Sequence, residues 1–452
     1  MARVTDFECP FYPDFEVWHP NRLRMETNMK SIRPHIHCCA LSLSLLAPTF
    51  GGEEDFVHLP EEAIKLPTGE PDAFEWLTPS LDIRTRYEFR EQEPLDSANS
   101  FTARARVGLT LGTFNGFSAF GELEATAALN NDFDAGPGNT SPNNIGQTAI
   151  ADPENVELNR AWIQYKKDGI LAKVGRQRII RNDAFHIGNV GWRQNEQTFD
   201  AAQVAYDNDD FNIAYVFSNG AQRIFGDNAG GFAEEFEGDF HFIDATYKSS
   251  IGDLGAYAYL IDVDNNTNVG ESNTVGVFGN FGPVYLEASY QDGTSSLVDG
   301  IVGGAQEDYD AFLVRGRYTL KTEAGAFSAG IDWAQEDYKT PFQTAHAPFG
   351  YADAFLAQQI GLNKNGNFTG IFDAYLKYAK KGLPGGITFK ADLHYFADED
   401  LGTTYGYEAD IVLVKKFTDN LTGLIKGAYF FADGSGDFND IRQITVDLSY
   451  KY

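Results

Sequence analysis

Sulfur-containing residues are nearly absent from this sequence. All three cysteines and all three methionines precede residue 40, and neither residue type occurs from Gly51 onward. A chain that is exported through an oxidising compartment has reason to avoid unpaired thiols. The distribution therefore favours export of the part that follows residue 50.

The chain also lacks the long apolar run of a membrane-spanning helix, which needs roughly 18 or more consecutive apolar residues. Its mean hydropathy is slightly negative, although it contains 45 Gly, 36 Phe and 22 Tyr among 452 residues. A polar chain that is rich in glycine and aromatic residues is typical of a transmembrane β-barrel, whose strands face lipid on one side and water on the other.

Basic residues are scarce relative to acidic ones. The sequence has 35 Lys and Arg against 65 Asp and Glu, for a formal net charge of −30, and residues 1–52 contribute none of it. Such an acidic chain disfavours nucleic acid as a partner. Solvated acidic loops are a sufficient explanation of the excess.

The N-terminal region has the pattern of a secretory signal. Lys30 and Arg33 give a positive start, Cys39–Ala47 is a short apolar run, and small residues continue to Gly52. We expect cleavage between Ala47 and Gly52. The predicted division is a non-native upstream extension at 1–28, a signal peptide at 29–52, a polar periplasmic N-terminal segment at 53–80 and a barrel at 81–452.

From residue 81 onward, runs of about ten residues alternate polar and apolar side chains, which indicates strands. Connections after even-numbered strands are short and those after odd-numbered strands are mostly long, as in bacterial outer-membrane barrels. The fold class is therefore all-β: a transmembrane antiparallel β-barrel of about 18 strands, with short periplasmic turns and long extracellular loops. The predicted strands are 81–91, 100–113, 116–128, 156–166, 170–178, 199–207, 211–217, 240–249, 255–262, 273–279, 282–291, 308–320, 324–336, 369–379, 386–397, 405–417, 421–431 and 440–450.

The last strand is the sharpest single signal. Its alternate residues from Ile444 to Tyr452 are apolar or aromatic, and those between them are polar. A terminal amphipathic strand that ends in an aromatic residue is the usual address for the barrel-assembly machinery. We therefore expect the outer membrane of a Gram-negative bacterium, with its lipid and lipopolysaccharide as surroundings.

Alternation also predicts which side chains face the lumen. A guanidinium on the lipid face near the bilayer midplane would cost roughly 2–4 kcal/mol, so the arginines are expected to point inward. Two hypotheses remain open: the arginines form a ladder for anions, or they pair with wall carboxylates. The predicted pore-lining, anion-binding residues from strands are Arg84, Arg86, Arg104, Arg106, Arg160, Arg176, Arg315 and Arg317, with the facing direction ambiguous at Arg160 and Arg176.

The connection at 179–198 is long and rich in amide and aromatic residues. Such loops commonly fold into a barrel lumen as constrictions, and functional residues concentrate on loops that a rigid scaffold holds. The alternative is an outer loop that packs on its neighbours.

Two segments carry a resemblance to a known family. Gly175-Arg176-Gln177 closes one predicted strand and Gly188-Asn-Val-Gly-Trp-Arg-Gln-Asn-Glu-Gln-Thr-Phe-Asp-Ala201 opens the next, while His346–Asp353 follows strand 324–336. In these segments the sequence resembles the alginate-export family of outer-membrane proteins. The resemblance implies an 18-strand barrel whose in-folded loops and arginine-rich constriction pass a uronic-acid polysaccharide. It implies a pore role for Arg84, Arg104, Arg106, Arg160, Arg176, Arg193 and Arg315, with Asp183, Asp200 and Asp353 as acidic counterparts.

Chemistry is disfavoured as the function. Histidines in the barrel region come without a nucleophile elbow, zinc motif or phosphate loop, so we predict no catalytic residue, metal ligand or cofactor. Three hypotheses remain: polysaccharide export with a periplasmic export partner, a general diffusion porin of mixed or weak selectivity, and a structural barrel plugged by its own loops.

Overall fold

The computed structural model describes residues 76–296, 305–344, 346, 348–355, 370–434 and 438–452. The predicted upstream extension and signal peptide lie outside the described residues, as does 53–75. The described chain consists of strands and their connections and has almost no helix, with three short helical turns at η1 (Pro142–Asn144), η2 (Asn182–Ala184) and α2 (Gly231–Glu234). None of the described helices is long and apolar enough to cross a membrane.

Eighteen strands make up the wall, and each predicted strand overlaps one of them. They are β1 (Leu77–Gln92), β2 (Ala98–Phe114), β3 (Phe117–Ala128), β4 (Asn155–Lys167), β5 (Ile170–Gln177), β6 (Thr198–Asp207), β7 (Phe211–Gln222), β8 (Glu235–Ser249), β9 (Gly252–Val263), β10 (Glu271–Phe281), β11 (Val284–Ser295), β12 (Glu307–Thr322), β13 (Gly325–Ala334), β14 (Ile371–Leu383), β15 (Ile387–Ala397), β16 (Thr404–Lys416), β17 (Leu421–Ala432) and β18 (Ile441–Lys451).

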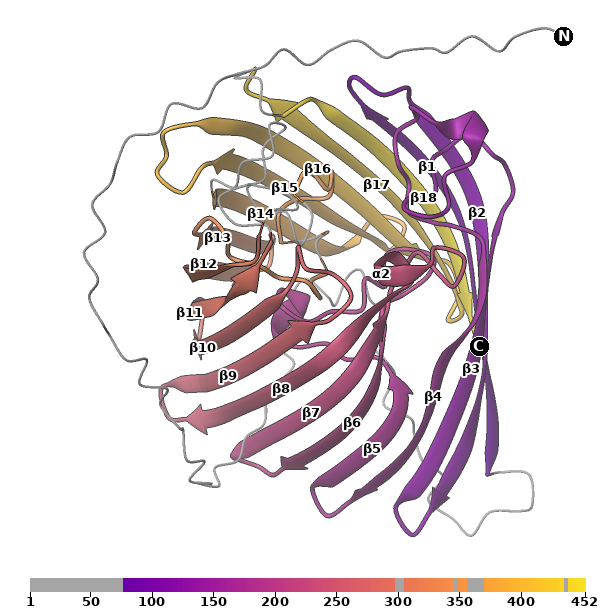
Figure 1. Ribbon diagram of the computed structural model, residues 1–452, viewed down its shortest axis with the longest axis vertical. Helices are drawn as coiled ribbons and strands as arrows, with labels where there is room; N and C mark the ends of the chain where they lie inside the picture. Colours follow the sequence, from indigo (N-terminus) through magenta and orange to yellow (C-terminus); the bar gives the residue numbers. More distant parts are fainter. Residues whose placement is uncertain (1–75, 297–304, 345, 347, 356–369, 435–437) are drawn as a thin grey trace, which may run out of the picture. The chain divides into compact units, whose positions relative to one another are not determined.

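The sheet closes on itself. Every strand pairs antiparallel with its sequence neighbours, and β1 pairs both with β2 and with β18. The closing ladder runs from Asp82 opposite Lys451 to Gln92 opposite Ile441. Figure 1 shows the strands following one another around the wall until β18 lies beside β1. The prediction of an antiparallel 18-strand barrel is confirmed.

Connections alternate between short and long, as predicted. Those after even-numbered strands have two to four residues, whereas the connection from β13 to β14 runs from residue 335 to 370. The turn between β2 and β3 is Asn115-Gly116, with φ of 50° and 93°. Both residues need positive φ in a tight hairpin turn of this kind, which Asn and Gly adopt most readily.

The two faces of the wall differ in chemistry. In β1, Ile83 and Tyr87 are exposed on the outside, while Arg86 and Glu88 between them are buried inside. Val107 of β2 is 58% exposed, although Arg106 beside it is buried. An apolar exterior and a charged interior are what alternation predicts for strands that separate lipid from a polar lumen.

The start of the barrel differs from the prediction. β1 begins at Leu77, so the last residues of the predicted 53–80 segment belong to the wall. Leu77–Ser80 pair with β2 alone, because the ladder to β18 ends near Asp82. A proline is tolerated at a strand position whose N–H has no partner, and Pro79 occupies such a position.

Apolar packing inside the barrel comes from loops as much as from strands. One buried cluster joins Phe349 and Phe355, from the loop after β13, to wall residues such as Phe430. A second joins Ile187 and Phe342, from two different loops, to residues of β6–β9. Part of the interior is thus occupied by loops that fold inward and pack on the lumen side of the wall.

The alternation of short and long connections gives a labelling prediction. A cysteine at exposed Asn143, in the long loop between β3 and β4, should react with an impermeant thiol reagent on intact cells. One at Asp419, in the short turn after β16, should react only after the cells are opened. The native cysteines all precede residue 40 and so lie outside the barrel. Reversed labelling would contradict the placement of long loops on the extracellular side.

Candidate pore constriction

One loop crosses the lumen. Residues 178–197, which connect β5 to β6, are here called the crossing loop. Its Asp183 accepts hydrogen bonds from Arg315 of β12 at 3.2 and 3.3 Å, and its Gln194 donates to Thr102 of β2 at 2.9 Å. β2 lies eight strands from β12 in one direction around the ring and ten in the other. The crossing loop therefore connects nearly opposite sides of the wall.

The crossing loop departs from common backbone geometry. Asn182, Asp183 and Ala184 have φ of 46°, 52° and 61°, and the β-branched Val190 has φ of 51°. Positive φ is costly for such residues and persists where surrounding contacts fix the backbone. Here the Val190 amide donates to the Thr344 hydroxyl at 3.0 Å. The loop conformation thus depends on its neighbours in the lumen.

A second loop holds the crossing loop in place. We call the described residues from 335 to 355 the paired loop. Its Phe342 forms a β-bridge with Ile187, and the Phe342 carbonyl accepts from the Gly188 amide at 2.8 Å. The Phe342 ring is fully buried and lies 4.8 Å from the ring of Phe240 and 5.3 Å from that of Phe199. Phe342 therefore anchors both loops to β6–β8.

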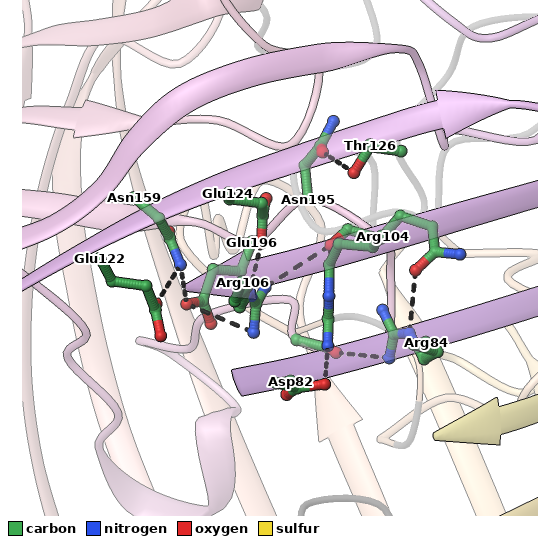
Figure 2. Close-up of polar contacts among 12 residues, drawn as sticks. Asp82, Arg84, Arg104, Arg106, Glu122, Glu124, Thr126, Asn159, Asn195 and Glu196 are labelled. Carbon is green, nitrogen blue, oxygen red and sulfur yellow. Dashed lines mark hydrogen bonds and ion pairs between the residues drawn. The ribbon is translucent and has the colours of Figure 1, made fainter. Parts of the chain in front are cut away.

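Glu196 is the centre of the densest polar network in the described lumen. It accepts from Arg178 at 2.7 and 2.8 Å, from Asn159 of β4 and from Asn189 at 2.8 Å. Arg106 of β2 lies 3.6 Å away. Burial alone would raise the pKa of Glu196, but Arg106 and Arg178 hold it well below its usual value. Glu196 is therefore an ionised carboxylate bound to the loop cation Arg178 and the wall cation Arg106. Figure 2 shows it beside Arg106 and Asn159.

Two arginines lie directly opposite each other on neighbouring strands. Arg84 of β1 pairs in register with Arg104 of β2, an arrangement that is unfavourable for like charges. Arg104 is compensated by Asp82 at 2.6 Å. Arg84 instead donates to the Gly191 and Arg193 carbonyls and, at 3.0 Å, to the Gln194 side chain. Among the described residues Arg84 contacts no carboxylate (Figure 2).

The arginine of the crossing loop lies among acidic groups. Arg193 is 3.1 Å from Glu88 of β1 and 3.7 Å from both Asp152 and Asp353. Asp152 lies in the loop between β3 and β4, and it also accepts from the Gln194 amide at 2.8 Å. Burial raises the pKa of Asp152, but the positive charges of Arg193 and Arg86 lower it by more. The pKa of Asp152 is therefore below its usual value. Three loops thus meet at one cluster of charges.

Two of the histidines on these loops are buried and neutral. His346 donates through Nδ1 to Asp353 at 2.8 Å, its Nε2 accepts from Lys426 of β17, and its ring stacks on Trp192 at 3.5 Å. Burial, then Lys426, lowers the pKa of His346 to about 3. His186 bonds to the Tyr338 hydroxyl at 2.8 Å, and burial, then Arg315, lowers its pKa to about 3 as well.

Most of the remaining predicted arginines also face the lumen and contact acidic or aromatic groups. Arg86 pairs with Asp447 at 2.7 Å, and Arg160 with Glu122 at 3.0 Å. Arg106 bonds to Glu124. Arg315 is 3.1 Å from Glu287 and 3.3 Å from Asp332, while Arg317 lies over the Tyr285 ring.

Arg176 and Asp200 correct the prediction. Arg176 shares a face with the exposed Val174 and lies opposite Ala161, which shares the outer face of β4 with Ile163. It pairs with Asp200 at 2.8 Å, and both therefore lie on the outer face of the wall. The cost of an outward guanidinium falls toward the interface. Arg176 is next to the last residue of β5, at the long-loop end, and is neutralised there.

An open space remains on the short-turn side of the crossing loop. A cavity of about 690 Å³ is bounded by residues 180–183 of that loop and by wall residues of β4–β8 and β10–β12. Its charged lining includes Arg181, Arg317 and Asp244. The loops thus divide the described lumen into a packed zone and this cavity.

Several residues of the constriction were not predicted. Asp152 contacts Arg193, and Glu196 contacts Arg106, but these two carboxylates come from separate loops. Glu196 lies inside the motif from Gly188 to Ala201, which was the available signal. Phe342 gave no signal, because nothing in the sequence distinguishes a loop phenylalanine that becomes buried from one that stays exposed.

Comparisons with known proteins agree with this architecture. Solved structures with similar folds include Acinetobacter baumannii OccAB4, at a TM-score of 0.60 and 13% identity over 83% of this chain and 98% of that one. Pseudomonas aeruginosa OccK8 (OprE) has a TM-score of 0.57 at 14% identity, again over 83% and 98%. Pseudomonas aeruginosa OpdK with vanillate has a TM-score of 0.57 at 13% identity, with the same coverage. At such identities the likeness shows the fold alone.

Fold and family together define the class as an outer-membrane channel, a class whose members are not enzymes. Residues 75–372, about two thirds of the sequence, match the family described as alginate export, and the chain belongs to that family. A search of curated proteins found no match.

The anchoring role of Phe342 is testable. Phe342→Ala removes a buried ring whose loss typically costs about 3–5 kcal/mol, and this should release both loops. We expect a larger single-channel conductance in planar bilayers. The control is Phe114→Ala, because Phe114 is 77% exposed at a short turn. Unchanged conductance in Phe342→Ala would show that the loops are held without it.

The buried histidines predict opening in acid. Both have a pKa lowered from 6.5 to about 3. Between about pH 3 and pH 6.5 the histidines are therefore protonated when the loops are released into solvent, but neutral when the loops are packed in the lumen. Stability of the packed loops should therefore rise with pH across this window, by up to about tenfold per histidine per pH unit. We expect higher conductance at pH 4.5 than at pH 7. The double variant His186→Gln, His346→Gln should lose this dependence, and His241→Gln, on β8, should keep it.

Proposed function

We propose that this channel passes anionic solutes, either an acidic polysaccharide or a small organic acid, along the arginines of β1 and β2. Arg84, Arg86, Arg104 and Arg106 lie on the lumen side of two neighbouring strands, and Arg193 of the crossing loop lies against them. A planar guanidinium binds a carboxylate through two parallel hydrogen bonds. Such a row offers successive binding positions to a chain of uronic acids.

One observation carries this proposal: among the described residues, one carboxylate, Asp82, forms an ion pair within 4.0 Å with the opposed pair Arg84 and Arg104, and it contacts Arg104. The Arg84 guanidinium is occupied by neutral oxygens of the crossing loop. To the hydrogen bonds that a neutral oxygen accepts from a guanidinium, a carboxylate adds the attraction of opposite charges and a geometry that matches the guanidinium fork. A carboxylate that enters from solution can therefore replace the loop at Arg84, and entry of an anion and displacement of the loop would be one event.

Two comparisons support an acidic solute. The family is described as alginate export, and alginate is a polymer of uronic acids. The similar structure of Pseudomonas aeruginosa OpdK contains vanillate, which is a carboxylate. The first favours a polysaccharide and the second a small acid, and an arginine row serves either one.

The second candidate is a general diffusion porin of mixed or weak selectivity. It is favoured by the pairing of Arg86, Arg106 and Arg160 with Asp447, Glu124 and Glu122. Arginines that are neutralised in this way contribute little to selectivity. Arg84 and Arg104 are thus the residues that distinguish the two candidates.

The route to the membrane is also proposed from the sequence. Residues 29–52 would direct export and be removed, and β18, which ends next to Tyr452, would be recognised by the barrel-assembly machinery. In the membrane, lipid and lipopolysaccharide would contact the outer face. Polysaccharide export would add a periplasmic partner at the short-turn end.

The test is the ion selectivity of the purified channel. We expect an anion-selective reversal potential in a salt gradient. Two charges about 8 Å from the path contribute roughly 0.5 kcal/mol each even at the dielectric constant of water. Arg84→Gln with Arg104→Gln should therefore disfavour anions about fivefold and favour cations about fivefold, which lowers the anion-to-cation permeability ratio roughly 30-fold. High salt should reduce the difference.

The matched control is Arg442→Gln, because Arg442 is exposed near the long-loop end of β18 and its loss changes the charge outside the lumen. It should leave selectivity nearly unchanged. A cation-selective unmodified channel whose reversal potential is indifferent to the double replacement would favour the general porin.

A further inference from the structure

The wall formed by β14–β16 carries a second group of buried charges, apart from the arginine row. Asp392 of β15 lies directly opposite Asp410 of β16, and His394 lies directly opposite Glu408. All four residues are buried on the lumen side. Two carboxylates at directly opposed positions repel each other. Lys377 of β14 lies opposite Asp392 on its other side, whereas the uncharged Ala428 of β17 lies opposite Asp410, so positive charge is needed on the Asp410 side.

Three potential ligand atoms converge at this point. One atom each from Asp392, His394 and Asp410 lies within 4.8 Å of the other two. The Asp410 side chain is almost completely buried, at 2% exposure. No N–H or hydroxyl group of the described residues donates a hydrogen bond to its oxygens, which interact with the neighbouring carboxyl of Glu408. A buried carboxylate without donors is costly. Its two oxygens therefore have free coordination positions beside the imidazole of His394.

A fourth residue orients the histidine. The Nδ1 atom of His394 lies 2.9 Å from both oxygens of Asp373 on β14. A carboxylate that accepts from one ring nitrogen fixes the tautomer and leaves the lone pair on the other. This carboxylate–histidine arrangement is the usual support of a metal-binding imidazole. It raises the basicity of the ring as well as fixing its orientation.

The local charges leave room for a divalent cation. The lumen-facing group contains four carboxylates (Asp373, Asp392, Glu408 and Asp410) and two lysines, Lys377 opposite Asp392 and Lys390 two residues before it. With His394 neutral, the carboxylates exceed the ammonium groups by two. A divalent ion would balance this excess.

We propose that Asp392, His394 and Asp410 form a binding site for a divalent transition-metal ion of the zinc type, with Asp373 positioning His394. One imidazole nitrogen and carboxylate oxygens suit Zn²⁺ and its neighbours in the first transition series, whereas Ca²⁺ and Mg²⁺ take oxygen ligands alone. Three protein ligands leave a further position for water or for a group on a passing solute. The site contacts the loops through Glu408, which accepts from the Ala352 amide of the paired loop at 2.7 Å.

The first measurement is calorimetric titration of the full chain, folded in detergent, with ZnCl₂. Residues 1–58 contain three cysteines and four of the eight histidines, which can bind zinc themselves. The number of zinc ions bound at the proposed site is therefore taken as the difference between variants that all contain this segment. Asp410→Asn and His394→Gln should each bind one zinc ion per chain fewer than the unmodified protein. His241→Gln is the matched control and should bind the same number.

Asp373→Asn tests the positioning residue. It should keep the number of zinc ions and weaken one of them by about 10–100-fold, as for other partners of metal-binding histidines. Circular dichroism would establish that each variant retains the barrel. A loss of stoichiometry with a retained strand spectrum supports the site.

A second measurement needs no variant. Crystals of the unmodified protein grown with ZnCl₂ should show a zinc-edge anomalous peak between the side chains of Asp392, His394 and Asp410. Absence of that peak, together with equal zinc stoichiometry for the unmodified protein and Asp410→Asn, would overturn the proposal. In that case a proton, and not a metal ion, would neutralise the opposed pair.

Discussion

The structure depends on the pairing of β18 with β1. In the hydrocarbon core no water is available to a backbone amide or carbonyl, so a sheet can cross it only when no open edge remains. The ladder from Asp82–Lys451 to Gln92–Ile441 removes that edge. An even strand number follows, because an antiparallel ring can close only when its first and last strands run in opposite directions. The positions of all lumen residues are set by this closure.

Closure creates a second constraint inside the barrel. Successive side chains of a strand point to opposite faces of the sheet. Each apolar residue that faces lipid is therefore followed by a residue that faces the lumen, where it contacts either water or protein. In this chain many of them meet protein: three loops enter the lumen and bring carboxylates to the wall arginines. Buried charges of this kind need partners with good geometry, and Glu196, Asp152 and Asp353 provide them from separate loops. The loops therefore complete the electrostatics of the wall.

The barrel was accessible to prediction from the sequence because its rules are local. Period-two alternation specified the inward face of β1, β2 and β12, including Arg84, Arg104 and Arg315. The alternation of short and long connections specified the antiparallel order. The facing direction of Arg176 stayed ambiguous, because β5 is short and its residue 175 is a glycine, which has no side chain to mark a face.

The interior was less accessible. Which carboxylate meets which arginine depends on how loops return through the lumen, and the pairs Arg193–Glu88 and Arg86–Asp152 join residues 105 and 66 positions apart. The convergence of Asp392, His394 and Asp410 requires the register between β15 and β16, which alternation alone leaves open. The sequence shows only that Asp392 and His394 are two residues apart on one strand and therefore share a face.

The crossing loop also has a mechanical consequence. Because it is attached near β12 through Asp183 and near β1 through Arg193, it acts as a transverse brace. Any change of the barrel cross-section from round toward oval alters the span between these two attachments. Lateral pressure from the bilayer acts on the outer face, and the brace transmits the resulting deformation to the ion pairs that hold the loops. The elasticity of the membrane and the packing of the lumen are thereby physically connected.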